Sequence, residues 1–490
     1  MSLQTAGAIA SRSLGTISNQ ISIVSRNISA AGTPGASEKL ALLATDDLGV
    51  GLDSIGRATN GALFRSLLSA NGDQGAARSV SEALDRIDQA LDLSNASNSR
   101  SPASLIARLT SALQSYSATP GDETSGQIAL SAAKDVAAKL RDATAVTQDA
   151  RRDADARIDR AVADVNDLLA KFEAVNAEVV SGSAARADVT DALDQRDGLL
   201  TQLSASIGIR TVTRAHNDIV IYTDSGVTLF ETQPRTVTFQ QTPNLAPGTS
   251  GAAVYIDGVQ VTGVKSPLAL QSGEISGLSR LRDVLAPQYQ RQLDETARAL
   301  VVAFAEEDQS GSGGPPLAGL FTYAGASTAP GAALIGGLAG AIEVNAAVDP
   351  SVGGDLSRLR DGGVSGNSDY VYNASGASGY STRILQLVEA AATPLALDPI
   401  AELGTRGSVA SIASSSNGWF AAQRQQHTRD NTYSSALSAQ ATQALSNSTG
   451  VNLDEQMSRM LSLESSYQAS ARLLETVNGL FNTLLAALRA

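Results

Sequence analysis

Apolar residues at both ends of the chain recur at steps that follow a seven-residue repeat. The N-terminal series consists of Leu3, Ala10, Leu14, Ile17, Ile21, Val24 and Ile28. The C-terminal series consists of Leu453, Met457, Met460, Tyr467, Ala471, Leu474, Phe481, Leu485 and Leu488. A period of about 3.5 residues is typical of a coiled-coil seam rather than of a helix on a globular core. The pattern predicts two long terminal helices that pair with each other and with neighbouring copies, and these residues form the predicted assembly interface.

The two terminal helices differ in how their seams are filled. In the N-terminal helix, Gly7, Gly15 and frequent serines lower helix propensity, so the helix should form only against a partner. It is expected to end before Pro34, because a proline disfavours helical backbone at the residue before it. In the C-terminal register, Glu464 and Asn478 fall at core positions, where buried polar groups fix the register and lower stability.

Between the two ends the period of the apolar pattern changes. Residues 57–206 show helical periodicity and predict several helices, the longest over about 124–180. Residues 36–56 are predicted to be a polar connector. From about 209 to 260 the period becomes two, with turn residues between short β-rich runs, which predicts the hairpins of a small antiparallel domain. Helix is expected to return over 275–307 and again near the C-terminus.

We predict a multidomain, mainly α protein with a β insertion. Its parts are a terminal coiled-coil domain (1–35 and 450–490), a helical stalk (50–206, 273–310 and 410–449), an antiparallel β domain (207–272) and a Gly/Ala-rich variable region (311–409). The variable region shows few periodic signals and is expected to pack on the stalk or on the β domain. The β domain interrupts a stalk that draws helices from both halves of the chain.

Composition narrows the choice of partners. The chain of 490 residues carries a formal net charge of −13, whereas nucleic acid or an anionic membrane surface would require basic patches. No apolar run reaches the length of about 18 residues that a membrane-spanning helix needs. The first 30 residues are amphipathic and lack the continuous apolar stretch of a secretory signal, so export would use an uncleaved signal. Cysteine is absent, which excludes disulfides and thiolate chemistry.

Residues that could support catalysis or bind a metal are scattered. His216 and His427 are far apart and lack acidic partners at ligand spacing. Asp194 and Asp197 would share a helix face, as an acid–base pair does, but structural pairs with this spacing are much commoner. The glycine-rich segment 310–316 lacks the strand and helix that flank a phosphate-binding loop. We therefore predict no catalytic, cofactor-binding or metal site and no enzymatic activity.

Several segments resemble the bacterial flagellar axial proteins. Residues 25–35, SRNISAAGTPG, are similar to the NNIANANTPGY signature of rod, hook and junction proteins, with departures at several positions. Residues 449–457, TGVNLDEQM, and 466–472, SYQASAR, are similar to the C-terminal motif of the hook-associated protein 1 family, the FlgK-type hook–filament junction proteins. Residues 193–200 and 273–295 match interior elements of the same family.

The resemblance implies a structural protein that leaves the cell through the flagellar type III pathway and forms a ring between hook and filament. The terminal helices would form an inner tube, with the stalk outside it and the β domain outermost. The implied partners are further copies, the hook protein, the second junction protein (hook-associated protein 3) and an export chaperone at the C-terminal helix. No cofactor, nucleic acid or membrane partner is implied.

Three alternatives remain open at this stage. The chain could be another flagellar axial protein, either a hook protein or a flagellin. A secreted cell-wall hydrolase with coiled-coil ends would need a catalytic set within 310–415, where none is recognised. A coiled-coil signalling protein would need uninterrupted heptads in the middle of the chain, where the pattern predicts hairpins.

Overall fold

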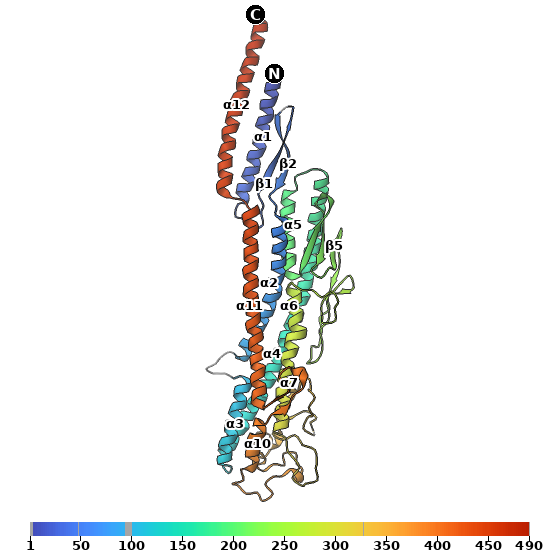
Figure 1. The fold of residues 1–490 in the computed structure, drawn as a ribbon, viewed down its shortest axis with the longest axis vertical. Coiled ribbons are helices and arrows are strands. Elements are labelled where there is room, and N and C mark those ends of the chain that lie inside the picture. Colours follow the sequence, from blue (N-terminus) through green and yellow to red (C-terminus); the bar gives the residue numbers. More distant parts are fainter. Residues whose placement is uncertain (1–2, 48, 94–99, 327, 490) are drawn as a thin grey trace.

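Two terminal helices project together from one end of a long helical stalk (Figure 1). The structure is a computed structural model that describes residues 3–47, 49–93, 100–326 and 328–489, without the side chains of 488 and 489. The helices are α1 (Leu3–Ala30), α2 (Gly61–Leu91), α3 (Pro102–Ala118), α4 (Glu123–Ala184), α5 (Thr190–Ser206), α6 (Glu274–Arg280), α7 (Ala286–Ala303), α8 (Leu338–Ala341), α9 (Arg358–Asp361), α10 (Thr382–Ala392), α11 (Val409–Thr449) and α12 (Leu453–Arg489).

The strands are short and form small antiparallel sheets. They are β1 (Lys39–Asp46), β2 (Gly49–Arg57), β3 (Ile209–Thr213), β4 (Ile219–Thr223), β5 (Thr228–Glu231), β6 (Gln233–Pro234), β7 (Val237–Thr238), β8 (Tyr255–Ile256), β9 (Val259–Gln260), β10 (Phe321–Tyr323), β11 (Ile342–Val344), β12 (Leu395–Ala396) and β13 (Arg406–Gly407). The mainly α fold with β insertions that the sequence predicts is confirmed.

Helix boundaries follow capping residues in the sequence. Ser101 caps α3 in front of Pro102, and Asp122 caps α4 by accepting from the backbone N–H groups of Thr124 and Ser125. These side chains satisfy donors that the first turn of a helix leaves free. The C-terminal end of α1 lies at Ala30, before Pro34, as the sequence predicts. The predicted helix over 124–180 is confirmed as α4, whose 62 residues span about 93 Å.

One buried apolar cluster runs through the stalk, and α4 contributes to it along most of its length, from Ala129 to Phe172. The same cluster takes in α2, α3, α7, the start of α11 and the β3–β4–β5 sheet. Among the described residues, no side chain of α1, α12, β1 or β2 belongs to this cluster or to the two smaller ones. The terminal elements therefore lie outside the hydrophobic core of the stalk.

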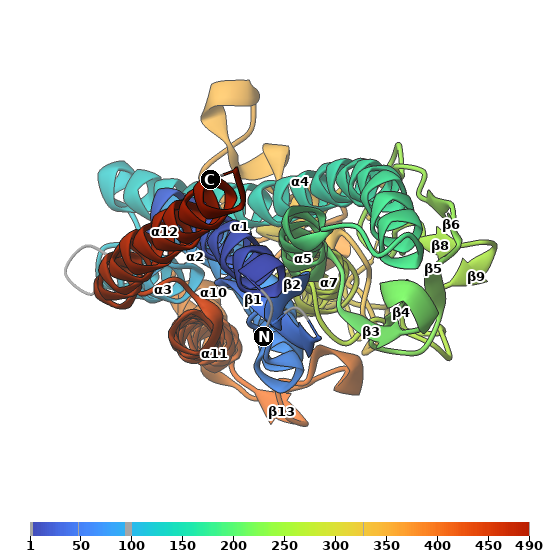
Figure 2. The same ribbon diagram turned by 90° about the horizontal axis from the view of Figure 1, so that it is seen from above.

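The segment predicted to form hairpins, which we continue to call the β domain, folds as two antiparallel sheets on the flank of the stalk, visible from above in Figure 2. One sheet has the order β3–β4–β5–β6 and the other β7–β8–β9. Arg282, in a π-helical turn between α6 and α7, joins this domain to α4. Its guanidinium group pairs with Asp155 of α4 and with Asp283, and it donates to the backbone oxygen of Ala252 at 2.7 Å.

The Gly/Ala-rich region 311–409 is held on the stalk by polar side chains of α7. Asp294 accepts from the backbone N–H groups of Gly337 and Ala339, and Arg298 donates to the backbone oxygen of Ala396. Burial raises the pKa of Asp294 to about 6, against the opposing effect of these hydrogen bonds. The region also places apolar side chains such as Leu338, Ile342 and Leu387 in the buried cluster of the stalk. They come from short helices and strands, which explains the weak periodic signal of the region in the sequence.

Residues 36–56 are not the polar connector that the sequence predicts. β1 and β2 form an antiparallel hairpin with a register shift between Leu42 and Leu43. The hairpin lies along α1, where Arg12 pairs with Asp46 at 2.6 Å and the Thr16 hydroxyl donates to the backbone oxygen of Val50 at 3.0 Å. The connector prediction is wrong because the alternation in this short, half-exposed hairpin is weak and its closing turn is acidic rather than an Asn-Gly pair.

Close helix packing makes one glycine of α6 intolerant of a side chain. A Cβ at Gly277 would lie 2.2 Å from the Ser79 Oγ and 2.4 Å from the Ala76 backbone oxygen of α2. We expect Gly277→Ala to lower the free energy of unfolding by about 1–3 kcal/mol through overpacking. Gly198→Ala in α5, where nothing lies within 4 Å, should instead raise it by up to about 1 kcal/mol. Urea unfolding of both variants checks the prediction, and equal effects would contradict it.

Candidate assembly surface and its junction with the stalk

The predicted terminal helices pack against each other within one chain. α1 lies between α12 on one side and the β1–β2 hairpin on the other (Figures 1 and 2). The Ser13 and Ser470 hydroxyls are 3.4 Å apart, and a Cβ at Gly7 would lie 3.6 Å from the Val477 Cγ1. We call α1, the hairpin and α12 together the terminal unit.

The predicted interface residues divide into three groups by their exposure in the single chain. The buried ones are Ala10, Ile17 and Val24. The partly buried ones are Leu3, Leu14, Ile21, Ile28, Met460, Ala471, Leu474 and Phe481. The exposed ones are Leu453, Met457, Tyr467 and Leu485. The side chain of Leu488 lies outside the described residues.

The predicted core positions Glu464 and Asn478 are wrong for the pairing of α12 with α1, since both are exposed. The less exposed positions instead include Gln456, Met460, Leu463, Ser470, Leu474, Val477 and Phe481. Of the predicted residues, Met460, Ala471, Leu474 and Phe481 are among the less exposed ones. Gln456, Leu463, Ser470 and Val477 each lie one position before a predicted core position. The face of α12 toward α1 is therefore more polar than predicted, with Gln456 completely buried.

Large apolar side chains remain uncovered on α12. They are Leu453, Met457, Leu461, Tyr467, Leu473, Leu480, Leu484 and Leu485. At 100° per residue, Met457 and Leu485 flank the α1-facing seam on one side, while Leu473 and Leu480 flank it on the other. An apolar surface of this extent on one long helix is typical of an interaction site.

A buried polar network lies where the terminal unit meets the stalk. The Asn27 side chain donates to the backbone oxygen of Lys39 at 2.9 Å and to the Gln456 side chain at 3.0 Å. Gln456 in turn donates to Glu38 at 2.9 Å. The backbone N–H of Glu38 donates to the backbone oxygen of Thr449 at the end of α11, at 2.8 Å. The network therefore joins α1, β1 and α12 where the chain passes from α11 to α12.

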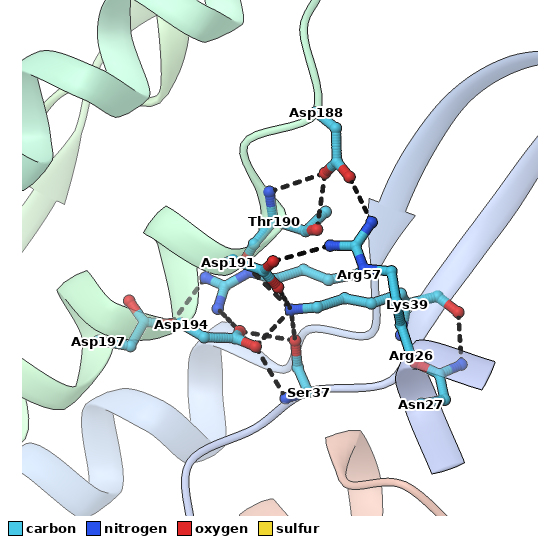
Figure 3. Close-up of polar contacts among 10 residues, drawn as sticks. All are labelled: Arg26, Asn27, Ser37, Lys39, Arg57, Asp188, Thr190, Asp191, Asp194 and Asp197. Carbon is cyan, nitrogen blue, oxygen red and sulfur yellow. Dashed lines mark hydrogen bonds and ion pairs between the residues drawn. The ribbon is translucent and has the colours of Figure 1, made fainter. Parts of the chain in front are cut away.

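Beside this network, four aspartates spaced three residues apart face three cations of the terminal unit (Figure 3). The four are Asp188, Asp191, Asp194 and Asp197, which we call the aspartate ladder. Each cation contacts two of them. Arg26 donates to Asp188 and Asp191, Lys39 pairs with Asp191 and Asp194, and Arg57 donates to Asp194 and Asp197, at 2.7 Å in both cases.

The inner part of the ladder is shielded from water and the outer part is not. Lys39 is 5% exposed and Asp194 is 15% exposed, whereas Asp191 is 76% exposed. Ser37 adds two hydrogen bonds to Asp194, from its backbone N–H at 3.0 Å and its hydroxyl at 2.6 Å. Exposed pairs contribute little free energy, so the pairs of Lys39 and Arg57 carry most of the electrostatic contact.

The two inner aspartates titrate differently. Burial opposes the charge of Asp194, but hydrogen bonds from Lys39, Ser37 and Arg57 outweigh it and hold the pKa of this carboxyl below its ordinary value. Its contribution to stability is present above the unfolded pKa of about 4 and is lost as the pH falls through the folded pKa. At Asp197 burial dominates and raises the pKa despite Arg57. Acid should therefore neutralise Asp197 before Asp194.

The other residues considered for chemistry do not gather around a site. His216 lies in a loop with left-handed backbone, at a φ of 56°. His427 is buried in α11 near Asp430, and burial lowers the pKa of its imidazole. Within the described ranges there is no group of three or more His, Asp or Glu side chains that could hold a metal ion. None of the helices in those ranges combines the length and apolarity needed to cross a bilayer.

Sequence comparison places most of the stalk and all of the β domain in a flagellar family. Residues 84–320, a little under half of the chain, match the family described as the flagellar hook-associated protein FlgK helical domain. The predicted resemblance to FlgK-type hook-associated proteins is confirmed. Residues 442–487, the end of α11 and most of α12, match the C-terminal family of flagellar basal body rod proteins of the FlgEFG type. The two family matches support a structural role in the flagellar axis.

Comparison with solved structures and curated sequences gives weaker similarity than the family matches do. The chain is similar to the flagellar hook junction protein FlgK from Burkholderia pseudomallei, at 19% identity and a TM-score of 0.43. This similarity covers 53% of the chain and 46% of the Burkholderia protein, so the chain spans about half the length of that relative. No curated protein sequence matches the chain.

Proposed function

We propose that this protein forms the ring that joins the flagellar hook to the filament. The observation that carries the proposal is the terminal unit, which lies outside the stalk core and leaves large apolar side chains of α12 uncovered on both flanks of its contact with α1. Because one chain cannot cover both flanks, neighbouring copies on either side are the natural occupants. Rings arise when a subunit uses two different faces to contact its neighbours.

The terminal helices would line an inner tube, with the stalk and the β domain farther from the axis. The arrangement of the elements favours this order, since the terminal unit lies at one end of the stalk and the β domain on its flank (Figures 1 and 2). The proposed partners are the hook protein below, hook-associated protein 3 above, and an export chaperone that covers α12 before assembly. Export is proposed to follow the flagellar type III pathway with an uncleaved signal.

A second candidate is another axial role, in the rod or the hook. The match of residues 442–487 to the C-terminal family of rod proteins is the specific observation in its favour. The FlgK-type match covers about five times as many residues and includes the β domain, so we favour the junction.

Electron microscopy of flagella labelled through the β domain separates these roles. An antibody against residues 209–260 should mark one short band at the tip of the hook. Label along the whole hook or in the rod would favour the second candidate, and label along the filament would identify a flagellin. Absence of label from isolated flagella, with the protein present in the cells, would contradict every axial role.

A further inference from the structure

The terminal unit is tied to the stalk by ion pairs where apolar packing would be expected. No described residue of α1, β1, β2 or α12 shares a buried hydrophobic cluster with the stalk. The chain crosses between the two bodies only twice, after Arg57 and after Thr449. Among the described residues, the hydrogen bonds and ion pairs that join the two bodies are backbone hydrogen bonds at these crossings, the pairs of the aspartate ladder, and the hydrogen bonds that Ser37 and Lys39 donate around it.

Each of the two bodies is held together by its own contacts. Inside the terminal unit, Arg12 pairs with Asp46, Asn27 bonds to the backbone of Lys39 in both directions, and Gln456 bridges α12 to α1. The stalk has its own continuous core along α4. Loss of the ladder would therefore leave both bodies folded and remove what fixes the angle between them.

We propose that the aspartate ladder, which begins just before α5 and continues along it, is an electrostatic lock that sets the orientation of the terminal unit on the stalk. The inner pairs, Lys39 with Asp194 and Arg57 with Asp194 and Asp197, form the lock, since they are shielded from water. When the charge of Asp194 is removed, the terminal unit swings as one body about the two chain crossings. The lock is a property of the folded chain, so its test does not depend on the role proposed above.

The absence of cysteine from the sequence allows the swing to be measured with spin labels at introduced cysteines. One pair, Ser18→Cys with Ala439→Cys, reports the distance between α1 and α11 across the junction. A second pair, Ser18→Cys with Gln468→Cys, reports the distance between α1 and α12 within the terminal unit. All three positions are exposed, so a label at each replaces no packed side chain. Each pair is measured in the full-length chain by pulsed electron paramagnetic resonance.

We expect Asp194→Asn to widen the distance distribution across the junction about twofold or more, because the terminal unit could then bend at the two chain crossings. The distribution within the terminal unit should stay as narrow as in the parent chain. Asp191→Asn, in the exposed part of the ladder, is the matched control and should change neither distribution. The proposal is overturned if Asp194→Asn leaves the junction distance narrow, if the parent chain is already as broad, or if Asp191→Asn broadens it equally. It is also overturned if the distance within the unit broadens together with the junction distance, because the unit would then unfold instead of swinging.

Discussion

Replacing Leu474 or Ile21 by aspartate is expected to leave cells without attached filaments. Leu474 lies on the face of α12 toward α1, and Ile21 lies between the buried Ile17 and Val24 on α1. An aspartate at either site would place a charge in an apolar layer, or force that segment out of the pair. Since a loss of about 1.4 kcal/mol weakens a contact about tenfold and each subunit of a ring repeats the loss, assembly should fail.

The stalk should not respond to either change. No described residue of α1 or α12 belongs to the stalk core, so both variants should melt at the temperature of the parent protein. Ser465→Asp on the exposed side of α12 and Ser18→Asp on the exposed side of α1 are the matched controls, and both should support filaments. Secretion is assayed separately: variant subunits in the medium, with flagellin shed beside them, place the defect in assembly. Normal filaments on Leu474→Asp would contradict the interface.

The helices and the β domain could be predicted because their signals are local. Helical periodicity and Pro34 mark helices and a helix end without reference to the rest of the chain. The change to a period of two after Ile209 likewise marks the β domain. Each of these features is decided within a few residues, and the structure confirms them.

The register of α12 could not be predicted because its apolar residues cover more than one face. Leu453, Met457 and Leu485 fit a seam of period 3.5 as well as Leu463 and Val477 do. The side chains that decide the register are Gln456 and Ser470, which contact Asn27 and Ser13 from positions 429 and 457 residues away in the sequence. A pattern of apolar residues alone does not identify polar residues that face a partner helix, as Gln456 and Ser470 do.

The aspartate ladder was visible in the sequence only in part. The sequence pattern places Asp194 and Asp197 on one helix face, but the cationic partner of both, Arg57, lies more than 130 residues earlier in the chain. The repeat of aspartate at every third position from Asp188 was the signal that could have suggested a structural role, because such a row must be solvated or paired. The role of the aspartate row depends on the β1–β2 hairpin, which supplies Lys39 and Arg57 and which the sequence pattern does not predict.

Arg282→Ala is expected to lower the free energy of unfolding by about 3–5 kcal/mol, the typical cost of removing one partner from a buried ion pair. Arg282 is 1% exposed, and its loss would strand the carboxylates of Asp155 and Asp283, which are 4% and 7% exposed. Both carboxylates also accept from backbone N–H groups of the β domain, those of Thr242 and Gly251. The damage should therefore spread from the π-helical turn into the loop between β7 and β8.

Arg152→Ala in α4 is the matched control, since Arg152 and its partner Asp149 are both exposed and such pairs contribute little. In urea unfolding, we expect the free energy of unfolding of the control to lie within about 0.5 kcal/mol of that of the parent chain. Arg282→Lys should not restore stability, because one ammonium group cannot replace a guanidinium that reaches Asp155, Asp283 and the Ala252 oxygen together. Hydrogen exchange should show the loss of protection at Thr242 and Gly251 in Arg282→Ala first. If the lysine variant were as stable as the parent chain, the site would need only a positive charge. That result would contradict the claim that the several N–H donors of the Arg282 guanidinium anchor the β domain.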